Sequence, residues 1–379
     1  FPFSVFNWPN NTADLAKFYP TSLLETGHDI LFFWVARMVM MGMALTDEVP
    51  FKQVYLHSMV RDAHGRKMSK SLGNVIDPIH VIEGISLESL GATLEGGNLD
   101  AKEVAKAKAG QAADFPDGIE ECGTDALRFA LCAYTSQARD INLDIKRVVA
   151  YRYWCNKLWN AIKFAMLNLG DDFKPQAPSA LDVQSLPFPC KWLVSRLNAA
   201  ITTTVSAMEA YNFSEATTAV YAFWQYEVCD VFIELMKPVM AKGEGSEAEK
   251  FATRTTLWLA LDHGLKLLHP FMPFVTEELW QRLPQPVDAT VPPSIMVADY
   301  PAPVKNWEDA AVEADMAYAQ DIIGKVRGLR SDYNLTKQKP HVYIACTDAG
   351  RAASLGALAA EIATLTTSSA VEILAAGAG

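Results

Sequence analysis

The sequence predicts an α/β segment that is followed by an all-α helical bundle and a small α+β tail. Short β-like runs mix with one helix-like stretch between residues 18 and 83. Apolar residues then recur at helical spacing from about residue 146 onward, and Val342 to Cys346 is strand-like. With 379 residues the chain exceeds the usual size of one hydrophobic core, so we expect two or three domains.

The α/β segment begins with a helix-like element and a strand. Gly27-His28-Asp29 comes just before an apolar stretch from Ile30 to Met43. The run from Val54 to Val60 is predicted to be a buried strand, and a basic loop follows it directly.

Residues 86–123 change in composition and are predicted to be an insertion that holds one short helix. Asp100 with Glu103 three residues later forms a capping-box pattern at the start of this helix. Gly110 is a natural stop. We expect the outer face of the insertion to be solvated.

In the bundle, apolar spacing, caps and proline breaks predict the helices. The first has a buried stripe from Tyr151 to Leu169, with apolar residues at alternating steps of four and three. The third should start at the cap Ser214 and stop before Pro238, because the residue that precedes proline disfavours the helical conformation. The others are predicted at about 193–208, 247–268, 276–283 and 308–331.

Composition narrows the classes of function. The formal net charge of -11 argues against a uniformly basic nucleic-acid coat, although RNA binding needs only a local positive face. Six scattered cysteines without a C-x-x-C pair indicate neither a zinc site nor a disulfide framework, and we predict no metal ligands. No run of 18 apolar residues is uninterrupted, so no membrane span is predicted. The first residues show neither an initiator Met nor a signal-peptide pattern, so we expect a part of a longer polypeptide.

The basic loop Lys67-Met68-Ser69-Lys70-Ser71 carries the clearest chemistry. It places two ammonium groups three residues apart, with hydroxyls beside them and the flexible Gly73-Asn74 behind. Such a loop can hold a triphosphate, because lysines act as mobile point charges and hydroxyls donate hydrogen bonds. Taken alone, the pattern also fits a solvated surface turn.

The loop lies inside a longer string that resembles the second signature of class I aminoacyl-tRNA synthetases of the valine, isoleucine and leucine group. The string comprises His57-Ser58-Met59-Val60-Arg61-Asp62, then Gly65 to Ser71, then Gly73-Asn74-Val75-Ile76-Asp77-Pro78. Upstream, Thr26-Gly27-His28-Asp29-Ile30-Leu31-Phe32-Phe33-Trp34-Val35-Ala36-Arg37-Met38 resembles the valyl members specifically. The resemblance covers nearly the whole chain.

This resemblance implies a site for ATP and L-valine. Lys67 and Lys70 are then the catalytic residues, which bind the β- and γ-phosphates, and Gly27 and Asp29 contact the ATP ribose. Trp34 forms a wall of the amino-acid pocket. The other implied ATP-binding residues are His57, Met68, Ser69 and Ser71, and Mg²⁺ accompanies ATP.

The same residues have plainer alternative roles. Asp29 can cap a helix, and the two roles are compatible. The apolar neighbours of Trp34 favour a place in the core. His28 and His57 fit hydrogen-bonded structural histidines better than catalytic bases, because adenylate formation uses the substrate carboxylate itself as the nucleophile.

Two strings on the helical side resemble tRNA-facing parts of the family. Gly123 to Arg128 and Ala138 to Asp144 are similar to the segment that joins the catalytic fold to the helical domain. Arg128 and Arg139 can contact tRNA phosphates there, but ion pairs with neighbouring aspartates fit equally well. Asn156 to Asn160 and Leu268 to Trp280 resemble the anticodon-binding domain. Within these two strings, Trp159 and Trp280 fall at core spacing.

The resemblance implies four parts: residues 1–85 as the C-terminal half of a Rossmann-type catalytic domain, 86–145 as a connecting segment with the insertion 86–123, 146–335 as a helical anticodon-binding domain, and 336–379 as a tail. The first class I signature is not in the sequence, so we expect this chain alone to be inactive or nearly so. The insertion resembles that of eukaryotic cytosolic enzymes, which implies a cytoplasmic protein. The resemblance as a whole implies tRNA(Val), L-valine and ATP as its partners.

Other functions stay open at this point. The alternatives are a non-catalytic tRNA-binding module and an isoleucyl or leucyl enzyme. The intact loop favours a catalytic parent, because a pure RNA binder has no need of a phosphate-binding loop. Association with a multi-synthetase complex or an elongation factor is left undecided by the sequence, as are the oligomeric state and the anticodon contacts.

Overall fold

The structure is a computed structural model that describes residues 1–96, 99–135, 140–175, 181–241, 244–286 and 291–375. The chain forms two compact units. The first comprises Phe1–Glu121 and Tyr134–Arg147, and the second comprises Cys122–Ala133 and Val148–Gly379. The chain therefore enters the second unit for a short stretch, returns to the first, and then completes the second.

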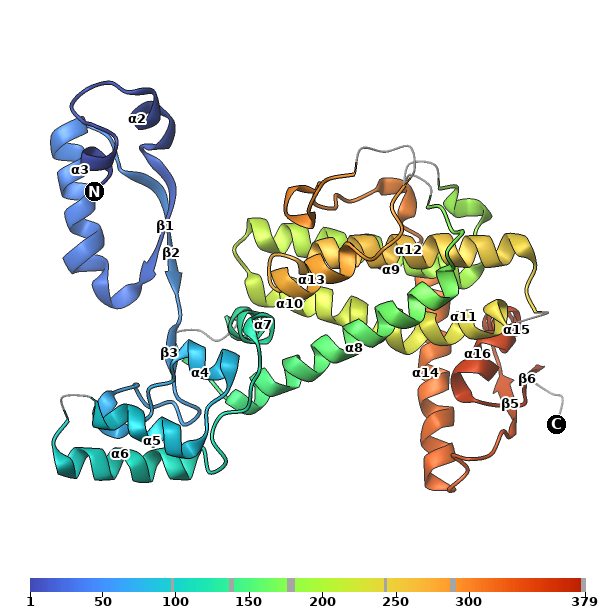
Figure 1. The fold of residues 1–379 in the computed structure, drawn as a ribbon. Helices are drawn as coiled ribbons and strands as arrows, with labels where there is room; N and C mark the ends of the chain where they lie inside the picture. Colours follow the sequence, from blue (N-terminus) through green and yellow to red (C-terminus); the bar gives the residue numbers. More distant parts are fainter. Residues whose placement is uncertain (97–98, 136–139, 176–180, 242–243, 287–290, 376–379) are drawn as a thin grey trace. The chain divides into compact units, whose positions relative to one another are not determined.

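The first unit contains a parallel βαβ arrangement (Figure 1). Strand β1 (Thr21–Gly27) pairs in parallel with β2 (Phe51–His57), and the register places Gly27 opposite His57. A parallel pair requires a crossover connection. Here α3 (Ala36–Thr46) supplies it. The short helices α1 and α2 precede the arrangement at Pro2–Val5 and Ala13–Phe18.

The predicted strand over Val54 to Val60 is present, but the expectation that it is buried is wrong. The chain divides there into β2 and β3 (Met59–Arg61), and most residues of β2 are exposed. Val54 and Leu56 are 38% and 46% exposed. The reason is that β1 and β2 form a two-stranded sheet among the described residues, so the apolar side chains lack a covering layer.

Strand β3 pairs in parallel with β4 (Asp140–Asn142). The connection between them holds α4 (Pro78–Glu83), α5 (Leu87–Glu95) and α6 (Ala101–Asp114), and then α7 (Thr124–Tyr134) of the second unit. The insertion thus has two helices, not one. The capping box of Asp100 and Glu103 is present, but α6 does not stop at Gly110. A Cβ at Gly110 would lie 2.9 Å from the Leu72 carbonyl oxygen, so this glycine serves close packing.

The second unit is a helical bundle with one large apolar core. Helix α8 (Ile145–Leu169) buries the predicted stripe, in which Leu158, Ala165 and Leu169 are fully buried. The other helices of the bundle are α7 (Thr124–Tyr134), α9 (Phe188–Glu209), α10 (Phe213–Ala222), α11 (Ile233–Met240), α12 (Glu247–Leu268), α13 (Pro273–Trp280) and α14 (Ala310–Asp332).

The third predicted helix differs from the prediction at both ends. Its cap is Asn212, whose side chain accepts from the backbone N–H of Glu215, and not Ser214. The helix also passes through Pro238 to Met240, after a wide turn over Phe223–Phe232. Pro238 has no N–H to donate to the carbonyl oxygen of Glu234, so the helix continues with one regular hydrogen bond missing.

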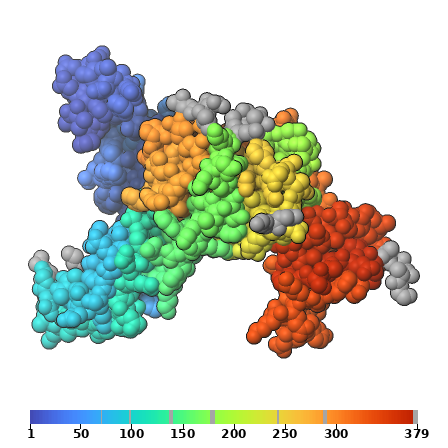
Figure 2. All heavy atoms as spheres, turned by 45° about the vertical axis from the view of Figure 1, so that its right-hand side comes forward, coloured from blue at the N-terminus to red at the C-terminus, as the bar shows by residue number. Residues whose placement is uncertain are grey.

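After α14 the chain forms two parallel strands, β5 (His341–Cys346) and β6 (Ala370–Ala375), with α15 (Ala349–Ala357) and α16 (Ala359–Thr366) between them. These elements gather beside α14 in the second unit (Figure 2). Arg330 of α14 is buried and donates to the carbonyl oxygens of Thr366, Thr336 and Gln338. This part of the chain is therefore fastened to the bundle by one buried cation as well as by apolar contacts.

One segment of the first unit, His28–Thr46, is long and apolar enough to cross a membrane by length and composition, with mean hydropathy 1.5. Arg37 interrupts it, which is why the sequence criterion of an unbroken apolar run did not select it. Only 11% of the segment is buried. A single helix of this kind is weak evidence for a membrane span, because apolar core helices can have the same length and composition.

Candidate functional site

The carboxyl ends of β1 and β2 bring three predicted site residues together. Gly27 ends β1 and faces His57 in the strand register. A Cβ on Gly27 would lie 2.7 Å from the Asp29 carboxylate oxygen Oδ1 and 3.6 Å from His57 Cε1. A larger residue at this position would therefore displace the Asp29 side chain. Open α/β sheets bind ligands at the carboxyl ends of their strands, which is where this cluster lies.

The two polar side chains of this cluster differ in their surroundings: His57 has partners within the protein, and Asp29 is exposed. His57 Nδ1 lies 3.1 Å from the Ser58 carbonyl oxygen, and Nε2 lies 3.5 Å from Glu25 Oε1, which fits the structural alternative for this histidine. Asp29 is exposed in the turn His28–Ile30. It does not cap a helix, because Gly27 precedes that turn and Val35 precedes α3. The Asp29 carboxylate is therefore accessible to a ligand.

Trp34 is not a core residue. It lies in the wide turn Leu31–Val35 before α3 and is 45% exposed. Its neighbours Phe32 and Phe33 are 75% and 63% exposed. The core alternative for Trp34 is therefore wrong, and its ring is accessible to a small molecule.

Asp62 organises the base of the basic loop. It is buried, and its Oδ1 accepts hydrogen bonds from the backbone N–H groups of His64 and Arg66 at 3.0 and 2.8 Å. Its Oδ2 accepts from Arg66 Nε at 2.5 Å and from Asn74 Nδ2 at 2.9 Å. Burial alone would raise the pKa of Asp62, but the hydrogen bonds from Asn74 and Arg66, together with the charge of Arg66, lower it to about 2.

Asn74 closes the loop from the other side. It is 2% exposed, and its Oδ1 accepts from the Ser69 backbone N–H at 2.9 Å. The expectation that Gly73-Asn74 is flexible is therefore wrong. Gly73 is buried as well and has a φ of +69°, a conformation that favours glycine. The two residues hold the loop ends together while the tip stays in solvent.

The tip of the loop offers cationic and hydroxyl groups. Lys67 is exposed, and no ion pair to it is found among the residues that the structure describes. The hydroxyl oxygens of Ser69 and Ser71 lie 3.3 Å apart, and Met68 and Ser69 are half-buried. The backbone of Lys70 begins the short turn Lys70–Leu72. In the described part of the chain no hydrogen bond joins this loop to Gly27, Asp29 or His57, so the structure shows two separate clusters.

Comparisons with known proteins identify the family. A family model described as class I tRNA synthetases (I, L, M and V) matches residues 1–144, and one described as the anticodon-binding domain of tRNA ligase matches residues 190–345. A valine–tRNA ligase of Rattus norvegicus is 53% identical over all 379 residues, and that of Homo sapiens is 53% identical over the same span. A mitochondrial valine–tRNA ligase of Arabidopsis thaliana is 58% identical over 340 residues, or 89% of this chain.

The chain belongs to the class I aminoacyl-tRNA synthetases. It spans about 30% of the length of these curated relatives.

Solved synthetase structures share the fold. A ternary complex of the Agrobacterium radiobacter K84 LeuRS with tRNA and LeuAMS aligns with a TM-score of 0.54 at 19% identity, over 82% of this chain and 33% of that chain. A methionyl-tRNA synthetase of Mycobacterium tuberculosis in complex with methionyl-adenylate aligns with a TM-score of 0.52 at 18% identity, over 76% of this chain and 49% of that one. These likenesses agree with a Rossmann-type half domain and a helical anticodon-binding domain.

In this synthetase chain, α7 makes polar contacts inside the second unit. Arg128 is exposed, but its guanidinium donates to the carbonyl oxygens of Pro270 and Phe271, at 2.9 and 3.3 Å. Asp125 is buried and accepts from the backbone N–H groups of Phe274 and Val275, at 3.2 and 2.7 Å. Arg128 thus has a structural role that involves carbonyls and not the aspartates considered from the sequence. Arg139 lies outside the described residues.

Two tryptophans of the synthetase bundle for which the sequence predicts core positions, Trp159 and Trp280, differ in exposure. Trp280 is 2% exposed, and its Nε1 donates to the buried carboxylate of Asp262 at 2.8 Å, as expected for a core residue. Trp159 is 41% exposed, so the expectation that it is a core residue is wrong. The guanidinium of Arg282 lies over its ring, 5.4 Å from the centroid. Helical spacing does not separate the two, because Trp159 lies at the edge of the apolar stripe of α8.

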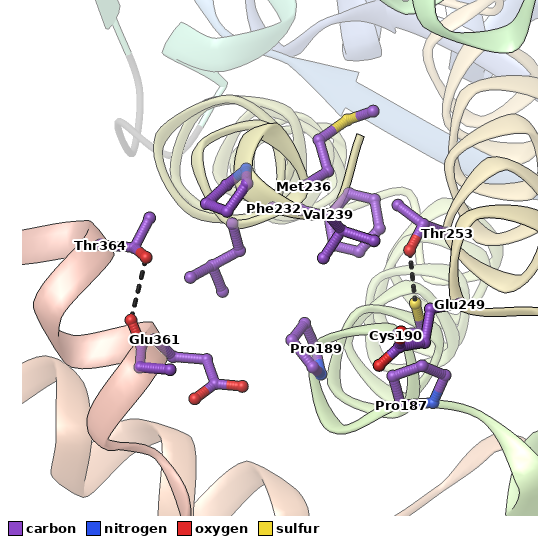
Figure 3. A pocket seen from close by; sticks show the side chains of 13 residues that line it. Pro187, Pro189, Cys190, Phe232, Met236, Val239, Glu249, Thr253, Glu361 and Thr364 are labelled. Atoms are coloured by element: carbon purple, nitrogen blue, oxygen red, sulfur yellow. Dashed lines mark hydrogen bonds between the residues drawn. The ribbon is translucent and has the colours of Figure 1, made fainter. Parts of the chain in front are cut away.

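Two cavities among the described residues have walls that contain none of the predicted site residues. One cavity of about 170 Å³ lies between α9, α11 and α16, with Pro189, Met236 and Glu361 in its wall (Figure 3). A second, of about 300 Å³, lies beside Gly73 and is also lined by Gln111 of α6. The candidate site is therefore an open arrangement of exposed groups in the first unit and not an enclosed pocket.

Sequence reasoning missed the residues that hold the loop. In the sequence Asp62 is only the last residue of the string from His57 to Asp62, and Asn74 is only part of a segment expected to be flexible. Asp62 comes twelve residues before Asn74, and Asp114 lies in the insertion. One signal in the sequence could have identified Asp62: it is an acid at the start of a cationic loop. A carboxylate can be buried only where several hydrogen-bond donors surround it, and this loop supplies such donors.

Proposed function

We propose that the protein to which this chain belongs is a valine–tRNA ligase, which joins L-valine to tRNA(Val) through a valyl-adenylate at the expense of ATP. The observation that carries the proposal is the 53% identity to valine–tRNA ligases in an alignment that spans all 379 residues of the chain. The exposed Lys67 beside two hydroxyls supports the same conclusion, because this loop has the groups that a triphosphate requires.

In the proposed reaction the valine carboxylate attacks the α-phosphorus of ATP, and pyrophosphate leaves. Negative charge then shifts onto the leaving β- and γ-phosphates. Lys67 and Lys70 neutralise that charge, and Ser69 and Ser71 donate hydrogen bonds to the same oxygens. Because these contacts strengthen as charge develops, they lower the barrier and do more than aid binding. Met68 sets the spacing between the two lysines.

The cluster at the strand ends is assigned to the rest of ATP and to the amino acid. The backbone of Gly27 allows close approach of the ribose, and the exposed Asp29 carboxylate accepts hydrogen bonds from its two hydroxyls. His57 supports this wall from β2. The exposed ring of Trp34 forms one side of the valine pocket.

Mg²⁺ enters the proposal together with ATP. This ion keeps several waters and usually binds through substrate phosphates and one or two carboxylates. Among the described residues no group of three His, Cys, Asp or Glu side chains is placed to hold a metal ion. The phosphates of ATP are therefore its expected ligands, and the chain contributes the lysines beside them.

The remaining parts are assigned to tRNA(Val). We place the catalytic half domain at residues 1–85, the connecting segment at 86–145, the anticodon-binding domain at 146–335 and an α+β tail at 336–379. Arg128 and Arg139 are assigned to tRNA phosphates, and Arg128 can do so with the donor groups that its two carbonyl contacts leave free. We place the protein in the cytoplasm, although the relatives include mitochondrial enzymes.

The test replaces the two loop lysines in the full-length protein. Lys67→Gln and Lys70→Gln should each lower kcat for valine-dependent pyrophosphate exchange on the order of 100-fold, because each removes a donor aimed at developing charge. Lys102→Gln, on the exposed face of α6, is the matched control and should leave kcat unchanged.

Isoleucine and leucine in place of valine complete the test. If either supports exchange as well as valine does, the valine assignment is wrong. If valine-dependent exchange survives both glutamine substitutions at the wild-type rate, the proposed role of the loop is wrong.

A further inference from the structure

Helix α6 of the insertion contacts the base of the basic loop through a chain of charged groups. Asp114, the last residue of α6, accepts a hydrogen bond from Arg66 Nη2 at 2.8 Å and lies 3.1 Å from His64 Nε2. Arg66 also donates through Nε to Asp62. The Asp114 side chain is only 19% exposed. The end of α6 is thus joined, through Arg66, to the carboxylate that organises the loop.

Two glycines let the loop and α6 touch backbone to backbone. A Cβ at Gly73 would lie 2.4 Å from the carbonyl oxygen of Ala107, which is fully buried in α6. A Cβ at Gly110 of α6 would lie 2.9 Å from the carbonyl oxygen of Leu72. Real Cβ atoms do not come this close to backbone atoms, so any side chain at either position would push the two segments apart.

We infer that the insertion positions the basic loop for adenylate formation and that Asp114 is a positioning residue for Lys67 and Lys70. This inference rests on the proposed function, because the exact placement of the loop matters only if its lysines meet the phosphates. Asp114 acts through Arg66 and Asp62, and Gly110 acts through Leu72. An insertion for which the sequence predicts only a solvated outer face is therefore part of the support of the site.

The kinetic signature of this role is specific. A misplaced loop loses contacts that form mainly in the transition state, so kcat falls while the KM for valine, whose pocket is assigned to another cluster, stays the same. An insertion that only contributes stability would change the amount of folded enzyme and leave kcat per folded molecule unchanged. The two roles therefore differ in a measurable way.

The experiment uses valine-dependent pyrophosphate exchange by the full-length protein with Asp114→Asn and Gly110→Ala. Each substitution should lower kcat roughly 10- to 100-fold, since a displacement of about 1 Å at a reacting group can have an effect of that size. Asp114→Glu keeps the charge and should restore part of the lost activity. Gly110→Ala is the sharper variant, because alanine favours a helix over glycine by about 1 kcal/mol and so does not weaken α6 itself.

Lys108→Gln is the matched control on the same helix. It removes the ion pair to Glu95 of α5, at 2.5 Å, which does not involve the loop, and kcat should stay at the wild-type value. If Asp114→Asn and Gly110→Ala keep the wild-type kcat while Lys67→Gln loses activity, the inference is wrong and the proposed function stands. If Lys67→Gln also keeps the wild-type kcat, the proposed role of the loop has failed and this inference fails with it.

Discussion

At the scale of single residues, the cationic groups of the loop could be predicted and their supports could not. Lys67, Ser69 and Ser71 were predicted because their spacing is local and can be read directly from the sequence. Asp62 and Asn74 act through a contact across twelve residues, and Asp114 acts from 48 residues beyond Arg66. Such partners depend on how the chain folds back on itself, which residue types and spacing do not determine.

Trp34 provides a prediction at this scale. Replacing it with alanine in the full-length protein should raise the KM for valine about tenfold or more, because burying an apolar side chain against a ligand contributes about 1.5–3 kcal/mol. Pyrophosphate exchange at varied valine concentration measures this. Phe32→Ala is the control, since Phe32 is more exposed than Trp34 and has no assigned role. An unchanged KM for Trp34→Ala would contradict the pocket assignment.

At the scale of elements, helices with local signals were predicted well. The fourth helix was predicted at 247–268 and is observed at Glu247–Leu268, because Ser246 and Glu249 form a capping box at its start and its last residues precede Pro270. The rules for glycine and proline failed at two positions, because Gly110 and Pro238 both lie inside helices. At Gly110 close packing explains the glycine, since a side chain would meet the carbonyl oxygen of Leu72, whereas nothing in the structure explains Pro238.

The contact between α12 and α13 leads to a prediction of stability. Trp280→Phe removes the hydrogen bond to the buried Asp262 carboxylate and should lower the free energy of unfolding of the helical unit by about 1.5–3 kcal/mol. Urea unfolding followed by circular dichroism measures this. Trp159→Phe is the control: because Trp159 is 41% exposed, its change should stay within about 0.5 kcal/mol. An equal loss of unfolding free energy in Trp280→Phe and Trp159→Phe would contradict the conclusion that only Trp280 is a core residue.

The same contact sets a pH dependence. Burial would raise the pKa of Asp262, but hydrogen bonds and charge from His263 and Lys266 lower it from 3.8 to about 2. The folded-state pKa is therefore below the unfolded one, so the stabilisation is fully present above pH 4 and is lost as pH falls through 2. The difference in free energy of unfolding between the wild type and Trp280→Phe should become smaller as the pH falls from 4 to 2, because a neutral acid is a weaker hydrogen-bond acceptor than a carboxylate.

At the scale of the whole molecule, the division of the chain differs from a simple order of domains. The helical spacing placed the start of the bundle at about residue 146, where the long stripe of α8 begins. The second unit also contains Cys122–Ala133, so α7 belongs with helices that come much later in the sequence. This arrangement was not predictable from periodicity, because α7 has the same apolar pattern whichever unit it joins.

The position of α7 leads to a prediction for shortened polypeptides. A polypeptide that begins at residue 122 should have a free energy of unfolding several kcal/mol larger than one that begins at residue 148. It should therefore unfold at a higher urea concentration. The longer one keeps Phe129, which is 1% exposed, and loss of a buried phenylalanine alone costs about 3–5 kcal/mol. Equal midpoints and equal slopes for the two polypeptides would show that α7 is dispensable.

Helix α7 also carries two charged side chains, each opposite in sign to the helix end that it faces. Its carboxylate, on Asp125, faces the positive end of α13, and its guanidinium, on Arg128, faces the negative carbonyl end that follows α12. Because both charges sit on one rigid helix three residues apart, the bend between α12 and α13 cannot open or close without breaking at least one of them. The angle between those two helices is thus held from outside by a segment more than 130 residues earlier in the sequence, so the bend depends on a helix that is translated before either of them.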